Sequence, residues 1–169
     1  MQPVNHEAPA GRVLDIAMAT HLFASDWAYC DQMATYAAAL VSQRRADSLR
    51  YANLFSSVLN ELLETVFRQH HPHGEIACRI FRGEPHDRIE LTIPCDASTR
   101  AFYESAMVDA SSPDVAEKYL SSLLDNAISD PRIGLLELAA DYRAQLSLVE
   151  NAGDTLTLVV DIIIDDSAI

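Results

Sequence analysis

The sequence is short of basic side chains. It has 12 Lys and Arg residues against 25 Asp and Glu, so its formal net charge is -13. A field of that sign repels phosphate backbones and anionic lipid surfaces, because binding there relies on basic side chains that release counterions. We therefore expect neither nucleic acid nor a membrane surface among its partners.

Cysteine and long apolar runs are also scarce. The 3 cysteines, Cys30, Cys78 and Cys95, are odd in number and show no CxxC spacing, which argues against a disulfide framework or a zinc ribbon. Residues 1–12 lack the basic and apolar regions of a signal peptide, and no segment reaches the roughly 18 apolar residues of a membrane-spanning helix. These absences predict a cytoplasmic location in a reducing compartment.

Two common catalytic signatures are missing as well. There is no Gly-x-Ser-x-Gly elbow and no glycine-rich phosphate loop with Lys among the 5 glycines. The usual hydrolase and P-loop chemistries therefore have no residues to act through.

What is present predicts one domain, residues 1–169, because 169 residues of which 49% are hydrophobic can build a core without staples. Periodicity and capping signals predict, in order, a strand over 12–22, a helix from an N-cap at Ser25 to about 43, a helix over 48–69 capped by Asp47, strands over 75–82 and 88–94, helices over 100–109 and after Pro113, a helix from 135 to 142, and strands over 145–150 and 155–164.

Helical spacing also predicts which side chains are buried. The expected sets are Trp27, Cys30, Met33, Ala37 and Leu40 on the first helix, Ala52, Phe55, Leu59, Leu62 and Val66 on the long helix, and Val115, Tyr119 and Leu123 after Pro113. Hairpins and one-sided helices together predict an α/β (α+β) fold, a two-layer sandwich. Its mixed, mostly antiparallel sheet of about five strands has helices on one face.

From Ser48 onward this order resembles the GHKL, or histidine-kinase-like, ATPase domain, in particular the anti-sigma-factor serine kinases. The family's long helix carries Glu-x-x-x-Asn followed by a basic residue; here Glu61 stands at the acid, Thr65 at the magnesium-binding Asn, and Arg68 at the basic position. Residues four apart on a helix share a face, as this pair requires. The resemblance divides the chain into a flexible N-terminus (1–11), a strand-helix extension (12–47) and a GHKL-like core (48–166).

Two further family motifs are present in altered form. The adenine-binding Asp-x-Gly-x-Gly corresponds to Pro94-Cys95-Asp96-Ala97-Ser98, which keeps Asp96 but neither glycine. The phosphate-binding Gly-x-Gly-Leu turn corresponds to Arg132-Ile133-Gly134-Leu135, which keeps Gly134 and has Arg132 in place of the first glycine. Asp96 has a second interpretation, as the N-cap of the following helix.

The resemblance therefore implies Glu61 as a general base and Thr65, Arg68, Asp96, Arg132 and Gly134 as cofactor-contacting positions, with no protein-bound metal centre. Because the nucleotide motifs are degenerate, we expect no cofactor, although ATP with magnesium remains the alternative. The leading hypothesis is a regulatory signalling protein that binds another protein, such as an anti-anti-sigma-like regulator, in a bacterial partner-switching type pathway. An active ATP-dependent serine kinase is the second hypothesis. A self-associating structural protein, in the form of a homodimer built on residues 12–43, is the third.

Overall fold

The computed structural model describes residues 11–43, 45, 47–70, 72–83, 86–124 and 130–163. The elements in this part of the chain are β1 (Arg12–Ala19), α1 (Thr20–Phe23), α2 (Ala28–Val41), α3 (Ser48–Arg68), β2 (Glu75–Phe81), β3 (His86–Pro94), α4 (Ala97–Ala110), α5 (Val115–Leu124), α6 (Ile133–Ala140), β4 (Gln145–Glu150) and β5 (Thr155–Ile163). Apart from Gly11, the expected flexible N-terminus lies outside the described residues, and so do 164–166 of the expected core.

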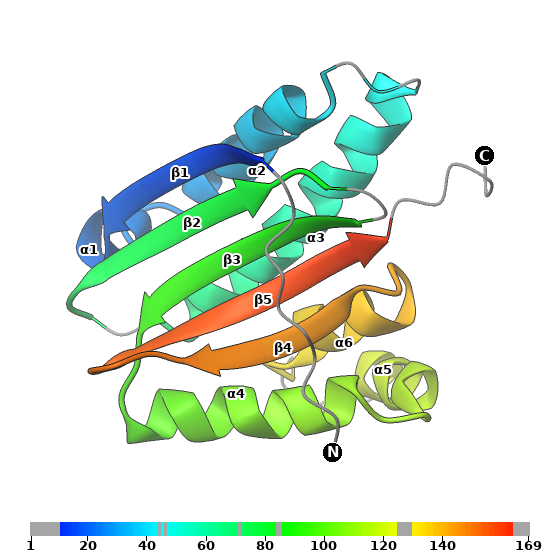
Figure 1. The fold of residues 1–169 in the computed structure, drawn as a ribbon. Coiled ribbons are helices and arrows are strands. Elements are labelled where there is room, and N and C mark those ends of the chain that lie inside the picture. The colour runs from blue at the N-terminus through cyan, green and yellow to red at the C-terminus, as the bar shows by residue number, and fades with distance from the viewer. Residues whose placement is uncertain are drawn as a thin grey trace.

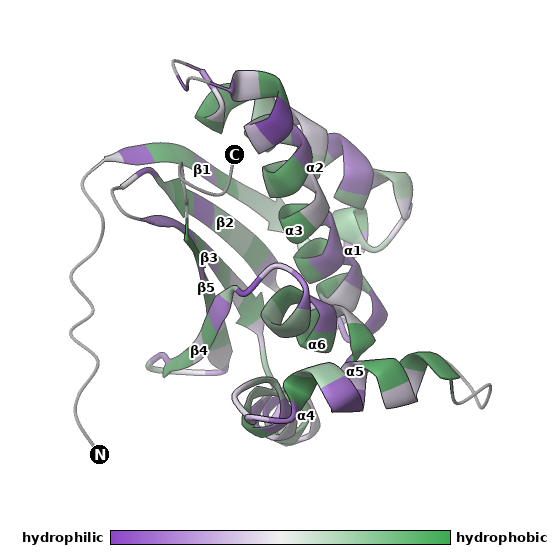
Figure 2. Cartoon of the chain, turned by 90° about the vertical axis from the view of Figure 1, so that its right-hand side faces the viewer, coloured by the Kyte–Doolittle hydropathy of each residue, from purple (hydrophilic) through white to green (hydrophobic). Residues whose placement is uncertain are grey.

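The strands form one sheet in the order β1-β2-β3-β5-β4, and its four neighbouring pairs within the described residues are antiparallel. Helices α1, α2, α3 and α6 lie on one side of the sheet, and α4 runs along the edge formed by β4 (Figures 1 and 2). No described helix covers the opposite side, which we call the open face. This two-layer α+β sandwich confirms the fold class predicted from the sequence.

The core lies between the sheet and the helices, because alternate strand residues point to that side. Ile80, Ile89 and Leu91 are fully buried there. Helix α3 begins as predicted, with the Asp47 carboxylate accepting a hydrogen bond from the Arg50 amide at 3.1 Å. Its expected buried stripe is confirmed except at Ala52, which is half-buried.

The prediction for the N-terminal region needs correction. The strand ends at Ala19 instead of 22, because Thr20 starts the short helix α1. Ser25 is not the N-cap of α2; the helix begins at Ala28, whose amide donates to the Asp26 carboxylate at 2.9 Å. Trp27, expected in the core, is 40% exposed, and its ring packs edge-on against Phe67 with 4.8 Å between centroids.

Two other helix boundaries and one buried face also differ from expectation. Helix α4 is longer than the predicted 100–109, because Asp96 caps it and starts it at Ala97. Helix α6 ends at Ala140, so Tyr142 lies beyond it. Helix α5 exists as expected but buries none of its residues, and Leu123 is 51% exposed. Helical periodicity marked an amphipathic helix there without revealing that it protrudes from the body (Figure 2).

A buried carboxylate ties the helix layer to the sheet. Asp87 of β3 is fully buried and accepts hydrogen bonds from Arg45 at 2.7 Å, from the Tyr51 hydroxyl, and from the Gly83 amide at 3.0 Å. Burial and the bond to Asp87 both raise the pKa of Tyr51, which keeps its proton on the hydroxyl. The carboxylate is therefore compensated on every side, as a buried charge must be.

The three cysteines are free and buried, in agreement with the absence of a disulfide framework. Burial raises the pKa of Cys30 and of Cys78 to about 12, so neither thiol is a nucleophile near neutral pH. Among the described helices, none combines the length and apolar character needed to cross a membrane.

Candidate functional site

The structure brings three of the residues singled out by sequence into direct contact. Gly134, in the first turn of α6, packs on Glu61 and Thr65 of α3. A Cβ atom at Gly134 would lie 2.6 Å from the Thr65 Oγ1 and 3.3 Å from both the carbonyl oxygen and the Oε2 of Glu61. The 2.6 Å distance is shorter than real Cβ contacts, so a side chain here would force the helices or Thr65 to shift, and glycine allows their close approach.

The Thr65 side chain is buried in this contact and already has a hydrogen-bond partner. It is fully buried, and its hydroxyl donates a hydrogen bond of 2.9 Å to the Glu61 carbonyl one turn earlier. A hydroxyl is a poorer magnesium ligand than an amide oxygen, because the ion prefers strong oxygen donors in near-octahedral geometry. The hydroxyl of Thr65 is in addition hydrogen-bonded to the backbone carbonyl of Glu61.

Carboxylates and one phenol surround the contact. Glu61 is half-buried, and its pKa is raised by burial first and then by Glu137 and Glu64, against the opposing charge of Arg68. The pKa of Glu137 is also raised, chiefly by burial, although a hydrogen bond from Tyr119 opposes the shift. Two neighbouring carboxyl groups with raised pKa values, one of them hydrogen-bonded to Tyr119, make this a site where a proton can be held at a carboxyl oxygen. Within the described residues, no group of three or more His, Cys, Asp or Glu side chains is arranged to hold a metal ion.

Sequence reasoning missed Glu137 and Tyr119. Glu137 lies three residues after Gly134, so helical spacing already placed it on the same face of α6. That signal was available. Tyr119 was assigned to a buried stripe, and nothing local indicated that its hydroxyl would reach Glu137. Burial and the neighbouring carboxylates raise the pKa of Tyr119 to about 12.

Arg68 extends from the same helix toward the start of α2. Its guanidinium pairs with Glu64 at 3.0 Å and lies over the Trp27 ring, 5.0 Å from the centroid. Glu64 also accepts a hydrogen bond of 2.8 Å from the Asn60 amide. The charge of Arg68 therefore offsets the acidic residues of α3 and anchors Trp27 through a cation–π contact.

Asp96 takes the capping role that was its second interpretation. Its carboxylate accepts from the Thr99 amide at 2.7 Å, which satisfies one of the unpaired donors in the first turn of α4. Asp96 also lines a hollow on the open face, and Glu61, Thr65 and Gly134 are not among the residues that line it. Its role as an adenine contact stays a prediction.

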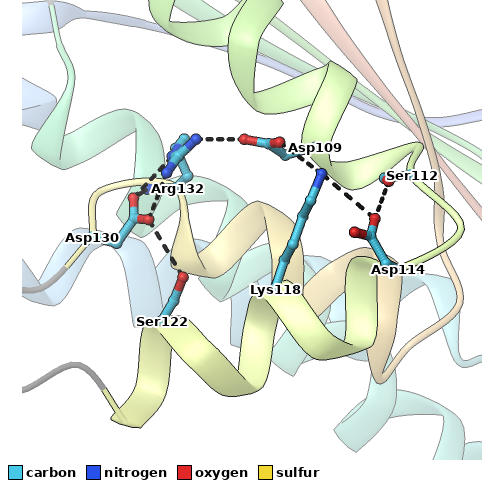
Figure 3. Close-up of polar contacts among 7 residues, drawn as sticks. All are labelled: Asp109, Ser112, Asp114, Lys118, Ser122, Asp130 and Arg132. Atoms are coloured by element: carbon cyan, nitrogen blue, oxygen red, sulfur yellow. Dashed lines mark hydrogen bonds and ion pairs between the residues drawn. The ribbon is translucent and has the colours of Figure 1, made fainter.

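Arg132 is held by its own cluster of charges. Its guanidinium donates to Asp130 at 2.9 and 3.1 Å and pairs with Asp109 of α4 (Figure 3). The bonds from Arg132 hold the pKa of Asp130 below its ordinary value. Arg132 thus joins the start of α6 to α4.

The same cluster includes α5. Lys118 pairs with Asp109 at 3.0 Å and with Asp114 at 3.5 Å, and the Ser122 hydroxyl donates to Asp130 at 3.4 Å. A small hollow of about 320 Å³ lies among these residues. Sequence gave a local signal for the pair of Asp130 and Arg132, two residues apart, but none for the distant Asp109.

Comparison with known proteins adds little to this geometry. No family model matches the chain, and no curated protein matches it. Among solved structures, a chain in the crystal structure of the SiaB-SiaC complex from Pseudomonas aeruginosa is similar over 88% of this chain and 89% of that chain, with 13% sequence identity and a TM-score of 0.49. This is a distant likeness, and it assigns neither a family nor a partner.

Proposed function

We propose that this chain is a regulatory signalling protein that acts by binding another protein, in a bacterial partner-switching type pathway. It does so on a histidine-kinase-like ATPase fold whose nucleotide site is degenerate. The element order supports the fold assignment, since a long helix, a hairpin, further helices and a closing pair of strands follow one another as they do in the GHKL family.

The observation that carries the proposal is the contact of Gly134 with Glu61 and Thr65. In the family, the corresponding residues of the long helix and the glycine turn face a shared magnesium nucleotide. Here Gly134 leaves less than the width of a methyl group before Thr65 Oγ1. If the correspondence with the family holds, this contact leaves no room between the helices for a phosphate and its metal.

The other motif positions support the same conclusion. Asp96 caps α4, and Arg132 pairs with Asp109 and Asp130. Each of these side chains has a structural role in the folded chain. A scaffold that keeps its elements while its ligand positions serve packing is suited to recognition of a protein.

Calorimetry tests the degenerate site. Titration of the purified chain with ATP and magnesium up to millimolar concentration should give no binding heat. Saturable binding would contradict the proposal, and loss of that heat in Glu61→Gln would identify the α3–α6 contact as its source.

Affinity capture from the source organism tests the proposed binding to another protein. It should recover one protein in stoichiometric amount, and a folded bait that recovers none would remove the proposal.

An ATP-dependent serine kinase is the second candidate, because the pKa of Glu61 is raised, as a general base working near neutral pH requires. This reading needs α6 to move away from α3 so that magnesium nucleotide can enter. Release of phosphate, or its transfer to a serine of a partner, would decide for it if Glu61→Gln abolished the activity and Glu117→Gln, an exposed acid on α5, did not.

A further inference from the structure

The open face of the sheet carries a wide hollow of about 1010 Å³. Its lining comes from β2, β3, β4 and β5, from the segment before β2, from the start of α4 and from the turn between β4 and β5. The hollow is separate from the contact between α3 and α6, because that contact lies on the helix side of the sheet (Figure 2). The proposed function therefore leaves it without a role.

Small side chains form the floor of this face. Strand register places one residue from each strand in a single row across the sheet: Ala17, Ala77, Thr92, Thr157 and Val149. On one side of the row the register places Arg79 beside Glu90, and on the other side Glu75 and Pro94 stand at the ends of their strands. A row of short side chains beside longer ones makes a trough.

The polar atoms of the floor bond to one another. The Thr92 and Thr157 hydroxyls lie 2.8 Å apart, and the Asn151 amide donates to Thr157 at 2.9 Å. A floor satisfied in this way can be covered without leaving buried donors or acceptors unpaired. Because the polar groups of the floor already bond to one another, the specificity for a partner must come from the charged residues around the floor.

The cations of the open face already have partners. Arg79 pairs with Asp15 at 3.5 Å, and Arg88 makes a two-pronged bond to Asp161 at 2.7 and 2.9 Å. Three acids that line the hollow do not: Glu75, Glu90 and Asp154 have no ion pair with any residue in the described part of the chain. The hollow is therefore left with an excess of negative charge, in a protein whose net charge is -13.

We propose that the open face is the docking surface for a basic segment of a partner protein, whose Lys or Arg side chains meet Glu75, Glu90 and Asp154 while its body covers the small-residue floor. This names the chemistry of the partner and rests on the proposed function. A second copy of the chain fits poorly, because it would bring an equally acidic surface against these carboxylates.

Nuclear magnetic resonance with a defined probe tests the surface itself. A short synthetic peptide of alternating Lys and Ser should shift the backbone amide signals of Ala77, Thr92 and Thr157, and its Glu–Ser counterpart should not. Glu90→Lys should weaken peptide binding roughly tenfold, because reversal replaces an attraction by a repulsion. Glu117→Lys, the same change on exposed α5, should leave binding unchanged. Shifts spread equally over other acidic surfaces would overturn the proposal.

Two further measurements keep the result unambiguous. The milder variant Glu75→Gln/Glu90→Gln removes charge without adding a cation beside Arg79, and it should weaken the peptide as well while the amide spectrum stays folded. Light scattering of the wild-type chain should show a monomer; a dimer that Glu90→Lys dissociates would assign the face to a second copy instead.

Affinity capture separates this inference from the proposed function. If the wild type captures a partner and Glu90→Lys loses it while Glu117→Lys keeps it, both stand. If the wild type and both variants capture the same partner equally, the proposed function stands and the open face is not the docking surface. If none captures a partner, the proposed function fails, whatever the peptide does.

Discussion

The two faces of the sheet differ in burial and in residue type, although the same strands form both. On β3, Asp87, Ile89 and Leu91 point to the helices and are fully buried, whereas Glu90 and Thr92 alternate with them on the open face and are half-buried. The helix side is packed with large apolar groups and a compensated charge. The open side has small groups and acids that form no ion pair within the described residues, so we expect stability to depend mainly on the helix face and recognition on the open face.

The largest effect should come from the buried charge. Asp87→Ala leaves Arg45 and the Tyr51 hydroxyl without their shared acceptor, and we expect a loss of about 3–5 kcal/mol in the free energy of unfolding. Urea denaturation measures it. Asp161→Ala, which removes the partner of Arg88 on the open face, should cost clearly less, because Asp161 is more exposed. Equal losses would break the contrast between the faces.

Apolar packing sharpens the same contrast between two neighbouring residues. Leu91→Ala removes a fully buried side chain, and we expect a loss of about 3 kcal/mol. Thr92→Ala, one residue later on the open face, gives up the bond to Thr157 and should cost about 1 kcal/mol. Both values come from denaturant midpoints with unchanged slopes. A Thr92 variant as unstable as the Leu91 variant would show that the open face belongs to the core.

Within the helix layer, Gly134→Ala probes the contact between α3 and α6. The added methyl would meet Thr65 Oγ1, so we expect a loss of about 1–3 kcal/mol. Thr65→Ala removes that oxygen and should recover part of the loss, which a double-mutant cycle measures as a coupling energy. Strictly additive losses would mean that the helices do not meet at this point.

The smallest effect is a pH dependence at Glu61. The folded-state pKa of Glu61 lies above the ordinary 4.5. At pH values between the unfolded-state and folded-state pKa, the folded chain therefore binds more protons than the unfolded chain. The contribution of Glu61 to stability therefore falls as pH rises from about 4.5 through the folded-state pKa. Glu61→Gln should raise the free energy of unfolding at about pH 7.5 relative to wild type, and do so less at about pH 5.

Chemical denaturation at both pH values checks this, with Glu117→Gln as the matched control on an exposed position. Asp130 acts in the opposite sense, because its folded-state pKa is lowered and its contribution is lost as pH falls. The comparison between variants removes that term, since it is common to all of them. A wild type and Glu61→Gln pair with the same pH profile would place Glu61 in solvent.

Local signals in the sequence predicted most of the fold. Strong alternation marked β2, β3 and β5, and the Asp47 cap with its apolar stripe marked α3, because these elements satisfy their own periodicity. The errors lie where tertiary packing decides. Trp27 has helical spacing for the core, yet it lies at the surface against Phe67 and Arg68, and α5 keeps its apolar residues exposed.

The candidate site was predictable only in part. Four-residue spacing placed Glu61 and Thr65 on one face of a helix, and the helices do bring Gly134 to them. Nothing local indicated that the helices would touch, or that Arg132 would turn to Asp109, because both depend on how α4 and α6 are placed. The two-layer prediction implied an uncovered face, but the hollow on that face was not predicted, because its lining depends on the register of neighbouring strands.

The pairing of β3 with β5 has a kinetic consequence. These two strands are adjacent in the sheet but separated in the chain by α4, α5, α6 and β4. Their seam, the line of pairing between β3 and β5, therefore joins the part of the chain that ends with β3 to the hairpin of β4 and β5. Such distant pairings close late and slowly, because the intervening loop loses entropy first. The hydroxyl bridge between Thr92 and Thr157 crosses this seam. A molecule that binds to both β3 and β5 would slow unfolding, because it would hold these two distant parts of the chain together.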